Sequence, residues 1–371
     1  MGFFTEYKEA SALLKTKQPI IFYVESRHYY SYFEQLITDL LANGETGICY
    51  ITSDQEDPLL QQAPAGIKPI YVKWMLGFLF SRLKADVMIM TMPDLDNLLF
   101  KRSKEVGHYI YMFHAAVSTH QQYRKKAFVN YDCIFCTGSY QVEEIKNAEM
   151  LYHKRAKTLI PYGYPLLDTI QTRMIQQEKK VVTPVILVAP SWFEGCIFDT
   201  CLPQLLLQLA QLPYQVIVRS HPEYEKRKKK EFEKLRRLIA AYPHMQIDKE
   251  PDVIKRLVTS DILITDRSGI AFEFAFGVGK PVLFIDTILK QTNPDWKELE
   301  VTPIENKLRS EMGVSILPAE MEKIPATIKR LETMAGEFAE KIATLKKKIF
   351  FNSPEGYQQG CNYVLGKIKK D

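Results

Sequence analysis

One stretch decides the fold: SDILITDRSGIAFEFAFGVGKPVLFID, residues 260–286. Residues 262–264 are a short apolar run typical of a buried parallel strand, and residues 265–269 are a small, polar turn. The pattern then fits a helix over residues 270–276, ended by two glycines, and a second strand over residues 281–285. In such a unit the turn lies at the amino end of a helix, where backbone N–H groups attract phosphate. The same pattern also fits a crossover that binds nothing.

The length and composition of the chain limit the classes of protein to which it can belong. The chain has 371 residues, which is enough for two domains, and 46% hydrophobic with 25% charged residues is a globular composition. The net charge of +5 is mild, so nucleic-acid binding is not expected. There is no run of about 18 apolar residues and no secretory leader pattern, so we predict a cytoplasmic protein without a membrane span.

The cysteines favour neither a metal site nor disulfides. Cys133 and Cys136 have a CxxC spacing, but they lie in a strand-like run, where residues three apart face opposite ways. We therefore predict reduced, buried thiols.

Strands alternate with helices along the whole chain, which is typical of parallel sheets covered on both faces. The pattern pauses in a polar stretch at residues 171–183 and then restarts. We predict an α/β fold of two Rossmann-like domains that face each other across a cleft. Residues 1–165 would be the acceptor domain and residues 184–350 the nucleotide-donor domain. Residues 351–371 would be a helix that packs back on the first domain.

Two histidines follow predicted strands, one in each half. His114 ends the strand over residues 108–113, and His221 follows the strand over residues 215–219. Parallel sheets present such positions to ligands, and a histidine there can take a proton from a hydroxyl. Arg219 lies on the same side of the extended chain as His221, so both can meet an anion. The structural alternative is a histidine hydrogen-bonded at the end of a strand.

Two other segments are predicted to line the same ligand site as the two histidines. Pro190 and Ser191 end the first strand of the second half, where a hydroxyl and exposed amides can line a ligand. Residues 265–269 are called the phosphate turn below. Glu273 lies about one helical turn into the helix that follows, so its carboxylate can accept hydrogen bonds from the hydroxyls of a ribose. The alternatives are a strand-to-loop turn and a solvent-facing helix residue.

Three further patterns concern metal or membrane binding. Asp94 and Asp96 have a DxD spacing, but Pro-Asp-Leu-Asp-Asn fits a helix start better than a metal site. Residues 226–237 make a strongly basic helix that can bind an anionic lipid surface or remain a solvated face. The apolar segment over residues 74–80, flanked by basic residues, can dip into a membrane surface or form a buried helix.

Four motifs in order along the chain resemble the CDP-glycerol glycerophosphotransferases that polymerise or prime teichoic acids. The turn TDRSG, the following FE pair and the KP strand resemble that family's TDYSS, F-D and (K/R)P segments. The segment VAPSW at residues 188–192 resembles APTW, His221 with its proline matches HP, and His114 matches a histidine usually followed by glycine. The resemblance covers about residues 85–290.

The resemblance implies the GT-B arrangement and catalysis without a metal or other cofactor. It implies that His114 is the base for the acceptor hydroxyl and that His221 stabilises the donor diphosphate. Ser268 and Gly269, with Thr265, would bind phosphate, and Glu273 would hold the ribose. The whole predicted donor site comprises Arg219, Pro190, Ser191, Thr265, Asp266, Arg267, Ser268, Gly269 and Glu273.

Two departures from the family pattern stand out. Ala115 replaces the glycine after the histidine, and Arg267 replaces a tyrosine in the phosphate turn. The guanidinium of Arg267 can contact the diphosphate or indicate a different donor. The long extra domain of polymerising members is also missing, which favours a primase or single-transfer enzyme.

The sequence therefore predicts transfer of glycerol phosphate, or a related alditol phosphate, from a CDP-alditol to a hydroxyl of a lipid-linked or polysaccharide acceptor, with release of CMP. The resemblance implies a cytoplasmic enzyme that lies peripherally on the inner face of the membrane. One alternative is a GT-B glycosyltransferase or sugar-nucleotide epimerase, since the fold supports both. The other is a non-catalytic protein that binds a membrane surface. The oligomeric state stays open.

Overall fold

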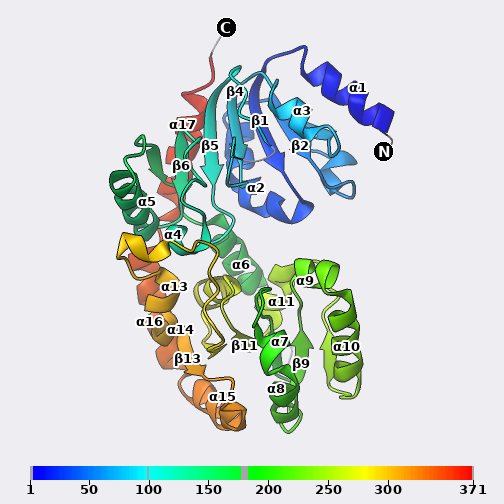
Figure 1. Ribbon diagram of the computed structural model, residues 1–371, viewed down its shortest axis with the longest axis vertical. Coiled ribbons are helices and arrows are strands. Elements are labelled where there is room, and N and C mark those ends of the chain that lie inside the picture. The colour runs from blue at the N-terminus through cyan, green and yellow to red at the C-terminus, as the bar shows by residue number, and fades with distance from the viewer. Residues whose placement is uncertain (1–2, 98–99, 177–182, 370–371) are drawn as a thin grey trace. The chain divides into compact units, whose positions relative to one another are not determined.

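The computed structural model describes residues 3–97, 100–176 and 183–369 (Figure 1). The chain divides into two units. Unit 1 comprises Met1–Pro165, Thr292–Val301 and Ile349–Asp371, and unit 2 comprises Leu166–Gln291 and Thr302–Lys348. The predicted polar linker begins within helix α6 (Pro165–Gln176), and its residues 177–182 lie outside the described part of the chain, as do residues 370–371 of the predicted final helix.

Unit 1 is built on a seven-stranded parallel sheet in the order β3-β2-β1-β4-β5-β6-β7. Its strands are β1 (Gln18–Val24), β2 (Ile48–Thr52), β3 (Ile67–Tyr71), β4 (Ala85–Met90), β5 (Val106–Met112), β6 (Cys133–Cys136) and β7 (Thr158–Pro161). Its helices are α1 (Phe3–Leu13), η1 (Arg27–Tyr29), α2 (Tyr30–Ala42), η2 (Pro58–Leu60), α3 (Leu76–Phe80), α4 (Thr119–Gln122), α5 (Ser139–Leu151), η4 (Trp296–Leu299) and α17 (Ser353–Leu365).

Alternate residues of these strands enter two separate cores, one on each face of the sheet. One core includes Ile21 of β1, and the other includes Ile20 of the same strand. Cys136 belongs to the first core and Cys133 to the second, which confirms that the CxxC pair faces opposite ways. All six cysteines are buried free thiols. Helix α17 packs against α2 and β7 (Figure 1).

Unit 2 is built on a six-stranded parallel sheet in the order β10-β9-β8-β11-β12-β13. Its strands are β8 (Val185–Val188), β9 (Gln215–Val218), β10 (Met245–Ile247), β11 (Ile262–Thr265), β12 (Val282–Ile285) and β13 (Gly313–Ile316). Beside α6, its helices are α7 (Ile197–Thr200), α8 (Leu202–Leu209), α9 (Pro222–Arg227), α10 (Lys229–Ala240), α11 (Val253–Thr259), α12 (Ile270–Phe272), η3 (Glu273–Val278), α13 (Ile304–Lys307), α14 (Arg309–Met312), η5 (Met321–Lys323), α15 (Ile324–Thr333) and α16 (Ala335–Ile349).

Two parallel sheets covered by helices confirm the predicted class, an α/β fold with two Rossmann-like halves. Strands β8, β9 and β11 are neighbours, so their carboxyl ends meet at one edge of the sheet. Each is a short and mostly apolar run, as expected of a strand buried on both faces. In the described part of the chain, no helix combines the length and apolarity needed to cross a bilayer.

Three local predictions were wrong. The segment around Asp94 and Asp96 does not start a helix, because both residues have φ of 62° and form a turn, which short polar side chains tolerate. The basic helix predicted over residues 226–237 is interrupted at Lys228, where φ is −114° and ψ is 51°. Strand β13 was missed, because its four residues lack the length and flanking turns that mark a strand in a sequence.

Candidate active site

The carboxylate of Asp266, directly after β11, holds the candidate site together. Its Oδ1 accepts hydrogen bonds from the backbone N–H of Ser191 at 2.7 Å and of Arg267 at 2.6 Å. Its Oδ2 accepts one from the N–H of Ile197 at 3.1 Å. Asp266 is fully buried, and burial raises the pKa of this carboxyl while the three N–H groups lower it. Asp266 therefore positions the loop after β8 against the phosphate turn.

The neighbouring hydroxyl strengthens the same junction. Thr265 Oγ1 donates to the backbone oxygen of Ala189 at 2.7 Å, which joins the end of β11 to the end of β8. Pro190 and Ser191 follow directly and are buried, Ser191 with 3% of its surface exposed. The structure thus brings these residues together, as predicted, but it directs the Thr265 hydroxyl into the protein. A phosphate contact from that hydroxyl stays a prediction.

Arg267, in the turn after β11, belongs to a cluster of polar side chains. Its Nη2 donates to the backbone oxygen of Thr287 at 3.2 Å and lies 3.6 Å from the Asp286 carboxylate. Arg309 shares that carboxylate and also donates from Nη1 to the backbone oxygen of Asp266 at 2.8 Å. Burial and the positive charge of Arg267 lower the pKa of Arg309 to about 10. Arg267 Nε is buried and has no hydrogen-bond partner among the described residues.

The helix after the phosphate turn differs from the predicted one. Ser268 and Gly269 are half-buried and precede α12, which has only three residues before the chain continues as the π-helix η3. π-Helices are rare and are often found at functional sites. Glu273 begins η3 and is half-buried, while its neighbours Phe272 and Phe274 are buried. Gly279 ends η3 in the left-handed conformation, with φ of 79°, as predicted for a helix C-terminus.

His221 is held in a defined tautomer at the end of β9. Its Nδ1 accepts a hydrogen bond from the N–H of Glu223 at 3.1 Å and so caps α9. An accepting Nδ1 carries no proton, so the neutral ring has its proton on Nε2, which can then donate to a ligand. The surrounding protein and the Lys290 ammonium lower the pKa of His221, which favours this neutral form. The ring of Trp192 lies beside it, 5.8 Å between centroids.

The guanidinium of Arg219 binds the loop after β10. Its Nη1 bonds to the Asp248 carboxylate, whose side chain is fully buried, and donates to the backbone oxygen of Glu250 at 2.7 Å. Arg256 Nε binds the same carboxylate at 2.7 Å. These bonds fasten the loop after β10, and a contact between Arg219 and the donor stays a prediction.

Two residues near this site were missed from the sequence. Lys290 lies five residues beyond the end of β12, and Arg309 begins α14. Both are isolated basic residues in segments without a recognised motif, so only their tertiary neighbours reveal them.

His114 lies in unit 1, two residues beyond the end of β5, and is half-buried next to two tyrosines. Its ring centroid is 5.2 Å from that of Tyr29 and 6.2 Å from that of Tyr32. Burial lowers its pKa to about 4, while a hydrogen bond with the Thr91 backbone raises it. Nδ1 is buried and has no hydrogen-bond partner among the described residues. A neutral imidazole with an unpaired nitrogen is suited to take a proton.

Metal binding finds no support in the described residues, which contain no group of three His, Cys, Asp or Glu side chains that could hold an ion. Asp96 Oδ1 instead lies 3.8 Å from the Lys101 ammonium. The expectation of no cofactor stays a prediction.

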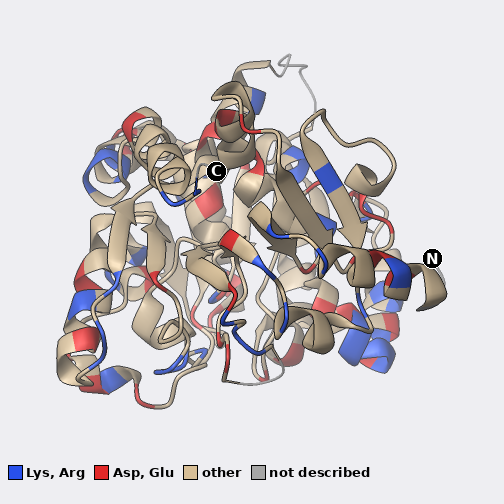
Figure 2. Ribbon diagram, turned by 90° about the horizontal axis from the view of Figure 1, so that it is seen from above, with Lys and Arg blue, Asp and Glu red and all other residues tan. Residues whose placement is uncertain are grey.

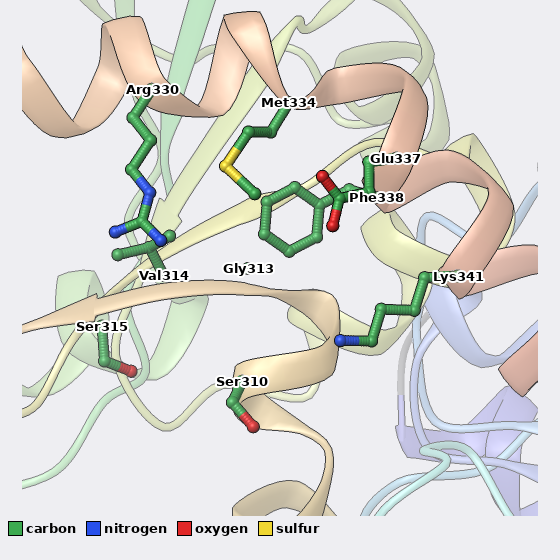
Figure 3. A pocket seen from close by; sticks show the side chains of 9 residues that line it. All are labelled: Ser310, Gly313, Val314, Ser315, Arg330, Met334, Glu337, Phe338 and Lys341. Atoms are coloured by element: carbon green, nitrogen blue, oxygen red, sulfur yellow. The ribbon is translucent and has the colours of Figure 1, made fainter.

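A separate cavity of about 360 Å³ lies in unit 2 between β13, α14, α15 and α16. Figure 3 shows Met334 and Phe338 over its centre, with Arg330 and Lys341 at opposite ends. None of the predicted site residues lines it. It is therefore distinct from the candidate active site.

The comparisons with known proteins support the resemblance. The family model described as CDP-glycerol:poly(glycerophosphate) glycerophosphotransferase matches residues 17–291. A comparison with curated proteins finds no match.

Solved structures share the fold. The wall teichoic acid polymerase TagF has 15% identity and a TM-score of 0.63, with 98% of this chain and 93% of that chain covered. MnaA from S. aureus, in a co-structure with UDP, has 12% identity and a TM-score of 0.61, with 95% and 98% covered. A glycosyltransferase from Rickettsia africae has 12% identity and a TM-score of 0.53, with 95% and 100% covered. At these identities the likeness shows the fold alone.

The family match spans both predicted histidines, the phosphate turn and Lys290. It confirms the resemblance and identifies the chain as an enzyme that transfers glycerol phosphate from CDP-glycerol. The chain belongs to the CDP-glycerol:poly(glycerophosphate) glycerophosphotransferase family.

Proposed function

We propose that the enzyme transfers the glycerol phosphate of CDP-glycerol, or a related alditol phosphate, to a hydroxyl of a lipid-linked or polysaccharide acceptor. The acceptor oxygen forms a bond to the β-phosphorus, the bond from that phosphorus to the bridging oxygen breaks, and CMP leaves. The observation that carries this proposal is the fixed tautomer of His221. A neutral ring whose Nε2–H is free of the α9 cap is a ready donor for a diphosphate.

The donor would lie at the carboxyl ends of β8, β9 and β11. His221 donates to the diphosphate, and Arg267 with the amides of Ser268 and Gly269 offers further positive potential to it. Glu273 accepts from the ribose hydroxyls. Asp266 does not contact the donor but positions the loops around it, because its two carboxylate oxygens already accept hydrogen bonds from three N–H groups.

His114 takes the proton of the acceptor hydroxyl. Its lowered pKa keeps the ring neutral near pH 7, so it can accept a proton as the oxygen attacks phosphorus. The ring hydrogen bond to Thr91 fixes its orientation, and the neighbouring rings of Tyr29 and Tyr32 restrict the space for the acceptor.

We expect no metal or other cofactor. Arginine and N–H donors at the phosphate turn supply the charge compensation that a metal ion gives in other phosphoryl transferases. The test is turnover in excess EDTA, with added Mg²⁺ as the comparison. Unchanged turnover supports metal-free transfer, and activity that returns only with Mg²⁺ refutes it.

The acceptor is proposed to be a teichoic-acid-type or other surface polymer. TagF, which shares the fold, is a wall teichoic acid polymerase. A lipid-linked acceptor would place the enzyme, as a cytoplasmic protein, on the inner face of the membrane.

Unit 1 carries a surface suited to that location. Four aromatic residues of α1 and the α3 region are exposed: Phe4, Tyr7, Trp74 and Phe78. The two elements are adjacent because Glu6 of α1 accepts hydrogen bonds from the N–H groups of Lys73 and Met75. Arg82 lies over the Phe78 ring, 4.2 Å from its centroid. Aromatic rings with nearby basic residues are typical of protein surfaces that sit at the lipid headgroups.

The basic helix is a weaker candidate for membrane contact. Arg227 pairs with Glu223, Lys228 with Asp199, and Arg236 with Glu233, so part of its charge is neutralised locally. Figure 2 shows acidic and basic residues interspersed along the ribbon. We therefore assign membrane contact to the aromatic surface of α1 and α3.

The decisive experiment is a product assay with purified enzyme and a glycerol-phosphate-primed lipid acceptor. Release of CMP from CDP-glycerol, lost in His114→Ala while CDP-glycerol still binds, supports the proposal. Release of a nucleoside diphosphate from a sugar nucleotide would instead identify a glycosyltransferase. Binding to anionic vesicles without any nucleotide binding would identify a non-catalytic membrane protein.

A further inference from the structure

Lys290 is placed beside the candidate donor site by the loop that follows β12. Ile288 of this loop packs close to Gly195, where an added Cβ would lie 2.7 Å from Ile288 Cδ1. Gly195 belongs to the loop after β8, which Asp266 holds in place. The loops after β8, β11 and β12 therefore meet, and Lys290 lies in the last of them, two residues beyond Ile288.

The charges around Lys290 place its ammonium among the site residues. It interacts electrostatically with the carboxylates of Asp266 and Glu305 and with the ring of His221. Lys290 is half-buried and makes no ion pair within 4 Å among the described residues. The carboxylate of Asp266 is committed to three backbone N–H groups. Its charge is therefore already compensated in part.

A half-buried ammonium without a close counterion has an energetic cost, because burial disfavours the charged form. The lowered pKa of Lys290 agrees with that cost. Ionisable groups with a shifted pKa cluster at functional sites, where a ligand can supply the missing charge. An anionic ligand near Lys290 and His221 would supply that negative charge.

We propose that Lys290 binds the diphosphate of the CDP-alditol donor together with His221. This proposal rests on the proposed function, since it adds a residue to the same donor site. His221 contributes one directed N–H, and Lys290 contributes a full positive charge with three donors on a flexible stem. Lys290 is therefore specific for the charge of the diphosphate and not for the nucleoside.

Isothermal titration calorimetry of the full chain tests this assignment with CDP-glycerol, CMP and cytidine at fixed salt. The variants are Lys290→Met, which keeps the length of the side chain without the charge, and Lys290→Arg, which keeps the charge. Lys329→Met is the matched control, because Lys329 is an exposed lysine on α15 of the same unit.

The expected result follows from losing one charged contact to phosphate. Lys290→Met should weaken CDP-glycerol binding by about 10- to 100-fold and leave cytidine binding within about twofold. Lys290→Arg should retain more affinity than Lys290→Met, and Lys329→Met should bind like the wild type. Because the substitution removes a buried charge, the melting temperature of Lys290→Met should stay equal or rise.

Other results overturn the assignment. Unchanged CDP-glycerol affinity in Lys290→Met would show that the ammonium does not contact the donor. Equal losses for CDP-glycerol and cytidine, with a lowered melting temperature, would show that Lys290 only maintains the structure. If the wild-type protein does not bind CDP-glycerol at all, the proposed function fails and the role of Lys290 fails with it.

Discussion

The two roles of His221 can be separated by substitution. His221 Nδ1 caps α9 by accepting from the N–H of Glu223, and Nε2–H is proposed to donate to the diphosphate. His221→Ala removes both interactions. His221→Asn keeps an acceptor close to the backbone, because asparagine is among the best N-cap residues, but its side chain is too short to replace Nε2.

The magnitudes follow from these contacts. Loss of an N-cap costs about 0.5–2 kcal/mol, which lowers the melting temperature of a unit of this size by about 1–8 °C. Loss of a hydrogen bond to a charged group costs about 1.5–3 kcal/mol, or about 10- to 150-fold in affinity. We therefore expect reduced CDP-glycerol affinity in both variants and reduced thermal stability in His221→Ala alone.

The assay pairs calorimetry with CDP-glycerol and differential scanning calorimetry of each variant without ligand. Binding of CDP-glycerol by His221→Asn with wild-type affinity would refute the proposed contact from Nε2. An equal drop in melting temperature for Asn and Ala would refute the capping role, since asparagine should replace the acceptor. A neutral His221 also predicts that affinity changes little between pH 7 and 8.

Three further predictions concern the framework of the site. Asp266→Asn replaces one accepting oxygen by a donor that faces a backbone N–H, so the free energy of unfolding should fall by about 1–3 kcal/mol in urea titrations; an unchanged midpoint would contradict the anchoring role. His114 and His221 have lowered pKa values, so the unfolded state binds more protons than the folded state in mild acid. Stability should be complete above about pH 6.5 and decrease as pH falls towards 4, and replacing both histidines by glutamine should flatten that decrease in pH-dependent melting curves. Gly313→Ala would place a Cβ 1.8 Å from the backbone oxygen of Val282, so it should disrupt the pairing of β12 with β13 and lower the yield of folded protein, whereas Gly336→Ala, with nothing within 4 Å, should not.

The alternation of apolar strands and helices was enough to predict the fold class. Short runs such as residues 262–264 are apolar on both faces, as is typical of strands in a parallel sheet covered by helices on both sides. The same logic located His114 and His221, because residues directly after such strands lie at the edge where ligands bind. These features depend on neighbours in sequence, so periodicity reveals them.

Local sequence patterns do not predict a conformation or a side-chain partner that long-range contacts determine. Asp94 and Asp96 match a helix start by composition, but hydrogen bonds from Asp94 N to Ala127 and from Asp96 N to Phe100 hold a turn. Arg219 is bound by a buried carboxylate 29 residues away in the chain, a partner that the sequence around Arg219 does not indicate. A single residue cannot reveal a partner that only folding brings near.

The sequence by itself determined two parallel sheets, a polar turn between a strand and a helix, a histidine after a strand in each unit, and the family. These rest on periodicity and short motifs, which are local properties of the chain. Only the tertiary structure decided that Asp266 anchors the loop after β8, that His221 Nδ1 accepts the N–H of Glu223, and that the charge of Lys290 acts on both side chains. Those features depend on hydrogen bonds and charges between separate loops, whose distances no local pattern encodes.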